Sequence, residues 1–264
     1  MDALEVSLDL LRRLQPGQVK NDVDIICSAV PSIAEELLSS IDQPLGIMTC
    51  SKTSKDYLTC DYNRDADSYR SPWSNVYNPP LHGGALPSDQ LRELELLAND
   101  SFNVYREMYY EGGISSVYMW DLEDDFAGVV LLRKPEGRAL WNSIHVFEAM
   151  TVGRKCNYRL TSTIILSVYA DDAISDKLHI EGSLTRQSQQ EAVVESPTVH
   201  ISNIGKIVED MELKMRALLQ EVYFGKAKDI VGEIRCQTSR RSRKEDEHKH
   251  REIIRGMGTT GVST

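Results

Sequence analysis

Residues 57–75 read YLTCDYNRDADSYRSPWSN and imitate a calcium-binding loop without completing one. In an EF-hand loop, oxygen-bearing side chains alternate, a glycine at the sixth position allows a sharp turn, and a glutamate at the twelfth binds calcium. Here the sixth and twelfth positions hold Ala66 and Pro72. The alternating oxygen-bearing side chains are present: Asp61, Asn63, Asp65 and Asp67. We therefore expect an ordered polar loop and no metal ligand.

The same residues predict how such a loop is held together. Asp and Asn side chains in turns hydrogen-bond nearby backbone amides. Arg64 and Arg70 are expected to pair with the loop carboxylates, and Trp73 is expected to anchor the loop in a core. Residues 57–60, just before the loop, favour a strand over the entering helix of an EF-hand.

Composition narrows the class of protein. The chain has 264 residues, enough for one large domain or two small ones, and a formal net charge of -10, which argues against a general nucleic-acid binder. Acidic residues among the first fourteen are wrong for a signal peptide, and the longest apolar run, 127–132, is too short to span a bilayer. The five dispersed cysteines indicate free thiols in a reducing compartment.

The chain divides into a helical part, a loop-rich part and a further helix. Residues 2–42 show three short apolar stripes at helical spacing, separated at Pro16-Gly17 and at Pro31, and predict an antiparallel bundle. Residues 43–87, here called the signature region, are loop-rich. Residues 88–110 predict an amphipathic helix that ends at Gly112-Gly113.

Residues 114–187 predict an antiparallel sheet, so the fold class is α+β. The expected strands are 115–121, 126–133, 142–150, 156–170 and 177–186. The fourth strand alternates between an apolar face and a mixed face, which suggests that both faces pack on something. Residues 198–223 predict a long helix across the sheet, with its charged side chains, Glu212 among them, on the outer face.

Motifs for catalysis are missing from the sequence. There is no Gly-x-Ser-x-Gly, no phosphate-binding glycine loop after a strand and no Glu-x-x-His pair. His145 alternates within a strand and is expected to be hydrogen-bonded there, while His248 and His250 are expected to be solvated. We predict a protein that is not an enzyme and that needs no cofactor.

Blocks of sequence spread over most of the chain resemble the β-subunit family of the heterodimeric F-actin capping protein. Besides residues 57–75, they are SIDQP (40–44), YEGGISSVYMWD (110–121), SIHV (143–146), LTST (160–163), GSLTRQ (182–187), NIG (203–205) and YFGK (223–226). The resemblance runs to about residue 231. It implies a domain over residues 1–235 with a helical stalk, an antiparallel sheet that continues into an obligate α-subunit partner, and a long helix across the sheet.

The resemblance also implies a function, which is calcium-independent binding to the barbed ends of actin filaments in the cytoplasm and cytoskeleton. Basic residues match family positions that contact actin or acidic phosphoinositides: Arg186, Lys214, Arg216 and Lys226. The plainer alternative for each is an ordinary solvated or paired surface charge. Asp42 and Asp61 match acidic positions that bind basic regulatory peptides of the capping-protein-interaction type, although bracing of the loop also explains Asp61.

The end of the chain departs from the family pattern. Where the family has a mobile amphipathic helix, residues 236–264 are charged and offer only Ile253, Ile254 and Met257 as apolar anchors. We expect this tail to be flexible and to contribute little hydrophobic anchoring on actin. Two other functions remain open: a scaffold subunit on the actin-related filament of dynactin, and a calcium-dependent regulator that uses residues 61–67.

Overall fold

The computed structural model describes residues 3–11, 14, 18–123, 125–136, 139–170, 178–221 and 248. The chain forms two units, Met1–Glu212 and Leu213–Thr264, whose boundary falls within helix α5 (Val199–Leu219). Almost all of the predicted tail, including Ile253, Ile254 and Met257, lies outside the described residues. None of the helices in the described ranges is both long and apolar enough to cross a membrane.

Three helices open the chain, as predicted, with a short 3-10 turn before the third. They are α1 (Ala3–Leu11), α2 (Val19–Ala29), η2 (Pro31–Ile33) and α3 (Ala34–Ser40). Their apolar stripes meet in a core of their own, in which Val23 and Leu37 are fully buried. Helices this short are marginal alone in water, so this shared core is what stabilises them.

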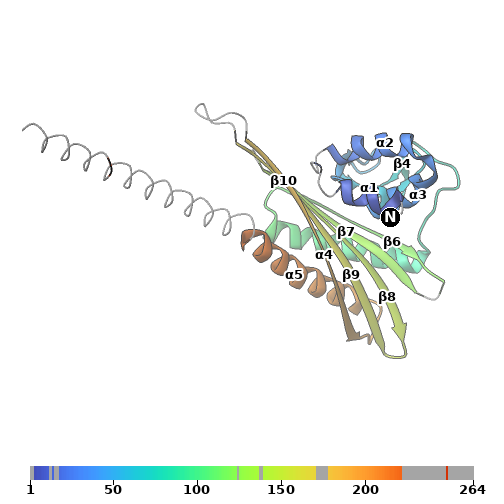
Figure 1. Cartoon of the computed structure of the whole chain (residues 1–264). Coiled ribbons are helices and arrows are strands. Elements are labelled where there is room, and N and C mark those ends of the chain that lie inside the picture. The colour runs from blue at the N-terminus through green and yellow to red at the C-terminus, as the bar shows by residue number, and fades with distance from the viewer. Residues whose placement is uncertain are drawn as a thin grey trace, which may run out of the picture. The chain divides into compact units, whose positions relative to one another are not determined.

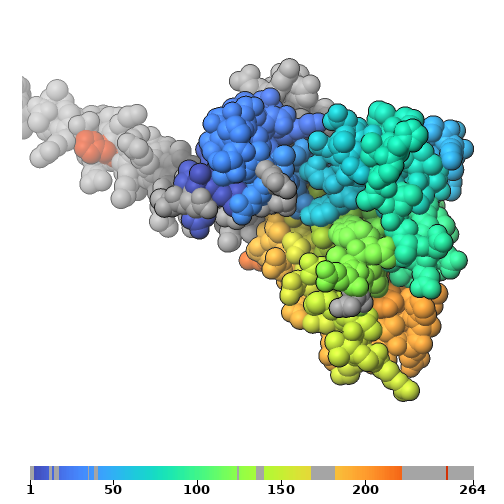
Figure 2. Space-filling view, turned by 90° about the vertical axis from the view of Figure 1, so that its right-hand side faces the viewer, coloured from blue at the N-terminus to red at the C-terminus, as the bar shows by residue number. Residues whose placement is uncertain are grey.

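The signature region is held by two small sheets, although its sequence reads mainly as loop. The elements are β1 (Gly46–Thr49), β2 (Asp56–Thr59), η3 (Asp61–Asn63), β3 (Arg64–Asp65), β4 (Ser68–Arg70) and β5 (Tyr77–Asn78). The strand predicted at 57–60 is therefore confirmed as β2. Asp65 pairs with Ser68 across a two-residue turn, where Ala66 takes a positive φ of 50°. The N-terminal helices (blue) and this region (cyan) adjoin on the surface in Figure 2.

The main sheet is a five-stranded antiparallel meander in the order β10-β9-β8-β7-β6. Its strands and the helix before them are α4 (Asp89–Tyr109), β6 (Ile114–Asp121), β7 (Phe126–Glu136), β8 (Ala139–Val152), β9 (Lys155–Ala170) and β10 (Leu178–Val193). Each predicted strand is present, and the last runs to residue 193, past the predicted end at 186. Helices α4 and α5 lie along one face of the sheet (Figure 1).

Both faces of the sheet are packed, as the alternation in the fourth strand predicts. On the helix-covered face, Tyr158 of β9 hydrogen-bonds His200 of α5 at 2.7 Å between Oη and Nδ1. On the opposite face, Leu45, just before β1, and Leu58 of β2 pack in one core. Their partners in the sheet are Val129, Ile144 and Ile165. This second core connects the signature region to the sheet.

Candidate functional site

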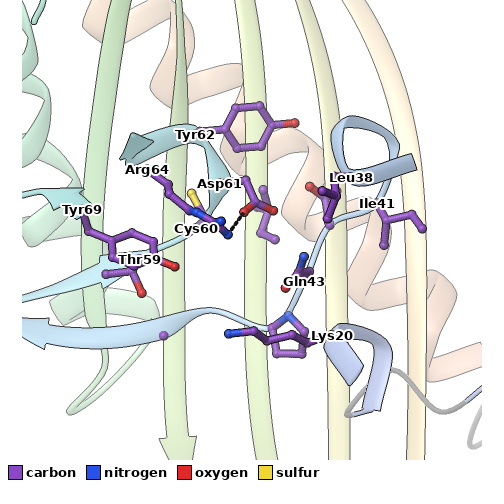
Figure 3. A pocket seen from close by; sticks show the side chains of 14 residues that line it. Lys20, Leu38, Ile41, Gln43, Thr59, Cys60, Asp61, Tyr62, Arg64 and Tyr69 are labelled. Carbon is purple, nitrogen blue, oxygen red and sulfur yellow. Dashed lines mark ion pairs between the residues drawn. The ribbon is translucent and has the colours of Figure 1, made fainter. Parts of the chain in front are cut away.

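A groove of about 320 Å³ lies where the end of the N-terminal helices meets the signature region. Its wall includes Lys20 of α2, Asp42 just after α3, Asp61 and Tyr62 of η3, and Arg64 of β3. Figure 3 shows these segments around the opening, with Arg64 beside Asp61. The structure thus brings together the two acidic residues, 19 positions apart in sequence, for which the family resemblance implies a peptide-binding role.

The two groove carboxylates are only partly compensated. Burial raises the pKa of Asp42; a hydrogen bond with Thr163 partly offsets this effect, and the negative charge of Asp61 adds to it. Burial also raises the pKa of Asp61, against the positive charges of Arg64 and Lys20. The Arg64 Nη1 lies 3.6 Å from the Asp61 Oδ1, and the Asp61 side chain is 39 % exposed. A cation supplied from outside would relieve this repulsion and desolvation.

An aromatic side chain that sequence reasoning did not single out completes the groove. Tyr62 stacks on Trp120 of β6 with ring centroids 5.8 Å apart and an angle of 9° between the planes, yet 40 % of Tyr62 remains exposed. The stacking fixes one face of the ring and leaves the rest accessible. An exposed, preorganised aromatic ring beside carboxylates is suited to the stem of an arginine or lysine. The available signal in the sequence was its position directly after Asp61.

The loop is braced chiefly by Asn63, which is 3 % exposed. Its Oδ1 accepts a hydrogen bond from the Cys60 amide at 2.8 Å, and its Nδ2 donates to the Arg70 carbonyl at 3.0 Å. These bonds confirm the prediction that side chains of the loop bond nearby backbone amides. They also occupy the Asn63 side-chain oxygen, which in an EF-hand would bind calcium. Within the described residues, no group of three His, Cys, Asp or Glu side chains is arranged to hold a metal ion.

The predicted partners of the loop arginines are half correct. Arg64 pairs with Asp61 as expected, but Arg70 pairs with Glu95 of α4 instead of a loop carboxylate. Both terminal guanidinium nitrogens of Arg70 donate to the Glu95 oxygens, Nη1 at 2.8 Å and Nη2 at 2.7 Å. Arg70 is 4 % exposed, so it needs a partner inside the protein, and the loop carboxylates are at the surface.

The expectation that Trp73 anchors the loop in a core is wrong. The ring is half-buried at the surface, where its Nε1 donates to the Asp56 carbonyl at 3.0 Å. The Lys55 Nζ lies 4.6 Å from the centre of the indole ring. The Trp73 indole thus bonds its one donor at the edge of β2 and leaves a ring face for a cation, so it does not need to be buried. The side chain that anchors the loop in the interior is Arg70.

The predicted actin-binding cations are on different elements. Arg186 lies on β10 opposite Ser162, hence on the helix-covered face of the sheet, and it is exposed. Its Nη1 donates to the Thr185 carbonyl at 2.9 Å. In the second unit, Lys214 is exposed and Arg216 half-buried on α5, while Lys226 lies outside the described residues.

Glu212 corrects the predicted outer face of the long helix, because it is buried, with 1 % of its area exposed. The His145 Nε2 lies 2.9 Å from its Oε1, and the Tyr110 hydroxyl donates a short hydrogen bond to its Oε2. Burial raises the pKa of Glu212, but bonding and attraction from His145, helped by Ser143 and Tyr110, outweigh it and bring the pKa to about 2. His145 is hydrogen-bonded within the sheet, as predicted.

Comparison with known proteins identifies the family to which this α+β chain belongs. The model of the F-actin capping protein, beta subunit, matches residues 4–231. An F-actin-capping protein subunit beta from Emericella nidulans is 54% identical over 256 residues, covering 95% of this chain and 96% of the relative. The corresponding protein of Aspergillus oryzae is 53% identical over 256 residues, with the same coverage. The chain belongs to the F-actin capping protein beta subunit family.

A solved structure shares the fold at low sequence identity. The homodimeric actin capping protein alpha subunit from Plasmodium berghei matches with a TM-score of 0.54 and 15% identity, covering 88% of this chain and 94% of that chain. At this identity the match concerns the arrangement of helices and sheet alone. It confirms that the α+β architecture is one found in a solved capping-protein subunit.

Proposed function

We propose that this chain is the β subunit of a heterodimeric F-actin capping protein that binds barbed ends and blocks addition and loss of actin. The observation that carries the proposal is the 54% identity to an F-actin-capping protein subunit beta over nearly the full length of both chains. The activity is one of binding, without a chemical step, and its place is the cytoskeleton in the cytoplasm. Calcium plays no part, since the loop that imitates an EF-hand uses Asn63 to bond backbone.

The free edge of β10 supports an α-subunit partner that continues the sheet. Among the described residues β10 pairs with β9 alone, over 16 residues, and nothing pairs with its other edge. A long unpaired edge is a site at which another chain adds, and proteins that keep one either protect it or use it. In this proposal the α subunit contributes the next strand.

Actin contacts are assigned to the basic residues Arg186, Lys214, Arg216 and Lys226, with a minor contribution from Ile253, Ile254 and Met257. The exposure of Arg186 and Lys214 supports this role, because an exposed cation on an otherwise acidic chain is available to an acidic partner. The same charges suit phosphoinositide headgroups, which would then compete with actin.

The groove is assigned to basic peptides of regulatory proteins of the capping-protein-interaction type. Asp42 and Asp61 supply two under-compensated carboxylates, and Tyr62 supplies an exposed ring between the helices and the signature region. Charge complementarity and a fixed aromatic surface are together sufficient to hold an arginine-containing segment.

Elongation of pyrene-labelled actin from filament seeds tests the main proposal. The chain is compared alone and co-expressed with an α subunit. We expect growth at barbed ends to stop at substoichiometric amounts of the co-expressed pair only. A well-folded pair that leaves growth unchanged would overturn the capping function.

A further inference from the structure

The Glu212 network joins three parts of the first unit: Glu212 near the middle of α5, His145 on β8 and Tyr110 at the end of α4. Every contact is buried. Glu212 and Tyr110 are each 1 % exposed and His145 is 0 % exposed. Beyond the bonds to Glu212, the His145 Nδ1 lies 2.8 Å from the Ser162 hydroxyl, and the Tyr110 hydroxyl lies 3.2 Å from the Ser143 hydroxyl.

Such a network stabilises a helix inefficiently, because its polar groups must be removed from water. A buried ion pair is often no more stabilising than well-packed apolar side chains of the same volume, because desolvation offsets the attraction. Most of the rest of this surface of α5 is apolar and buried: Ile204, Ile207, Val208 and Met211. Nearer the start of the helix, His200 makes one further buried polar contact, with Tyr158 of the sheet. Apolar contacts alone would therefore hold α5 on the sheet.

Apolar contacts do not, however, fix where along the sheet the helix lies. They are non-directional, and flexible methionine side chains adapt to several packings. Packed helices in other proteins shift past a neighbour by about one turn, 5.4 Å, between two stable arrangements. A buried carboxylate that needs a ring nitrogen on one oxygen and a hydroxyl on the other is satisfied in a single position and rotation.

We propose that the Glu212 network is a positioning device that selects one axial position and one rotation of α5 on the sheet. Lys214 follows Glu212 by two residues in the same helix, which is a rotation of roughly 200° about the helix axis. Lys214 itself is exposed. Glu212, His145 and Tyr110 thereby act on filament binding through the helix, without contact with actin; this last step rests on the proposed function.

The chain provides a matched control. Tyr109, next to Tyr110, donates a hydrogen bond to Glu209, one turn before Glu212, at 2.7 Å. That bond joins the same two helices, but it is exposed. Water can replace it, so Tyr109→Phe should leave α5 in place, whereas Tyr110→Phe removes a buried partner of Glu212.

The test uses the α–β heterodimer labelled at its methionine methyl groups. In the wild type, the Met211 methyl, assigned by substitution, should give one sharp resonance. In Glu212→Leu we expect several or broadened Met211 resonances and about tenfold faster release from barbed ends. The melting temperature should also fall, because the buried His145 and Tyr110 lose their partner. Tyr110→Phe should show the same effects more weakly, and Tyr109→Phe should show none of them.

A single Met211 resonance at the wild-type position in both Glu212→Leu and Tyr110→Phe would overturn the positioning role. If Glu212→Leu fails to fold, Tyr110→Phe against Tyr109→Phe decides the question. If the wild-type heterodimer caps no filaments, the proposed function fails, yet the methyl spectra still show whether the network fixes the helix. A change in release rate with unchanged spectra would also contradict the inference, since the effect would then not pass through the position of α5.

Discussion

Two acidic sites beside the signature region differ in how fully their carboxylates are paired. Beneath it, Glu95 is 0 % exposed and accepts hydrogen bonds from Arg70, Arg92 and, at 2.7 Å, the Met119 amide. At its edge, Asp42 and Asp61 line the groove with raised pKa values and few partners. The loop is therefore flanked by a carboxylate with both oxygens bonded, on α4, and by carboxylates left partly unmatched, at the groove.

We interpret the difference as one between an acid that stabilises the fold and acids proposed to bind a peptide. A buried carboxylate with a full set of donors stabilises only the fold, and it is invisible to a ligand. A carboxylate whose ionised form is disfavoured by burial is stabilised when a cation binds beside it. Such a carboxylate is therefore a candidate binding residue. The predictions below test this contrast, from the largest expected effect to the smallest.

Removing the matched acid should have the largest effect. Glu95→Leu leaves the buried Arg70 guanidinium without its counter-charge, and we expect a loss of about 3–5 kcal/mol in the free energy of unfolding of the heterodimer, measured in urea. The exposed neighbour Glu93→Gln should change it by less than about 0.5 kcal/mol. The double variant Arg70→Met, Glu95→Leu should recover a large part of the loss. A Glu95→Leu protein as stable as the wild type would abolish the distinction.

Asn63→Ala tests the brace between the two sites. It leaves the Cys60 amide and the Arg70 carbonyl without their partners, and we expect a loss of about 2 kcal/mol in unfolding free energy. Asp67→Asn, on the exposed turn nearby, serves as the control and should be neutral. Equal melting temperatures for the two variants would show that the amide of Asn63 is dispensable.

Changing the unmatched acids should affect binding and spare the fold. Asp42→Asn and Asp61→Asn should each weaken an arginine-containing capping-protein-interaction peptide by about tenfold, the value of one charge-assisted contact. Fluorescence anisotropy of the labelled peptide measures this, and the melting temperature should not fall. A drop in stability like that of Glu95→Leu would mean that these carboxylates are structural after all.

The pH dependence of stability sharpens the same contrast. Because the pKa of Asp42 is higher in the folded state, folding favours its protonated form; its ionisation therefore costs stability above the folded pKa, and this cost disappears as the pH falls below the unfolded value. Asp42→Asn should thus be slightly more stable than the wild type at neutral pH, and the gain should shrink towards acidic pH. Thermal melts over a pH series check this. A gain that stays constant with pH would contradict the assignment.

Calcium should have no effect at all. The side-chain oxygen of Asn63 accepts a hydrogen bond from the Cys60 amide, and position 66 is an alanine where an EF-hand has glycine. Melting temperatures with calcium and with a chelator should coincide. A calcium-dependent rise would restore the regulator hypothesis for residues 61–67.

Local patterns predicted the elements well. The alternation in 156–170 gave β9 and its two packed faces, and the apolar stripe of 88–110 gave α4. The partner of Arg70 was not predictable, because Glu95 is 25 positions away and the two meet only through the fold. For the same reason the helical pattern placed Glu212 outside: 67 positions separate it from His145, and no period in the sequence reports that contact.

Only part of the candidate site could be predicted from the sequence. Family resemblance supplied Asp42 and Asp61, and the structure places both on one groove wall. The family resemblance gave no reason to select Tyr62, because its role depends on stacking with Trp120, which lies 58 positions later in the sequence. The contacts of the basic residues and of the tail residues with actin stay predictions: Arg186, Lys214, Arg216, Lys226, Ile253, Ile254 and Met257.

The meander of the main sheet allows its strands to pair in the order in which they are synthesised. Every pairing from β6 to β10 joins strands adjacent in sequence, so each new strand can add to the last as the chain leaves the ribosome. The strand that emerges last, β10, is one of the two edge strands of this sheet, and its outer edge pairs with no strand in the described chain. The outer edge of β10 thus becomes available only once the rest of the sheet can already be folded. This order shortens the time during which a nascent subunit could pair this edge with the wrong chain.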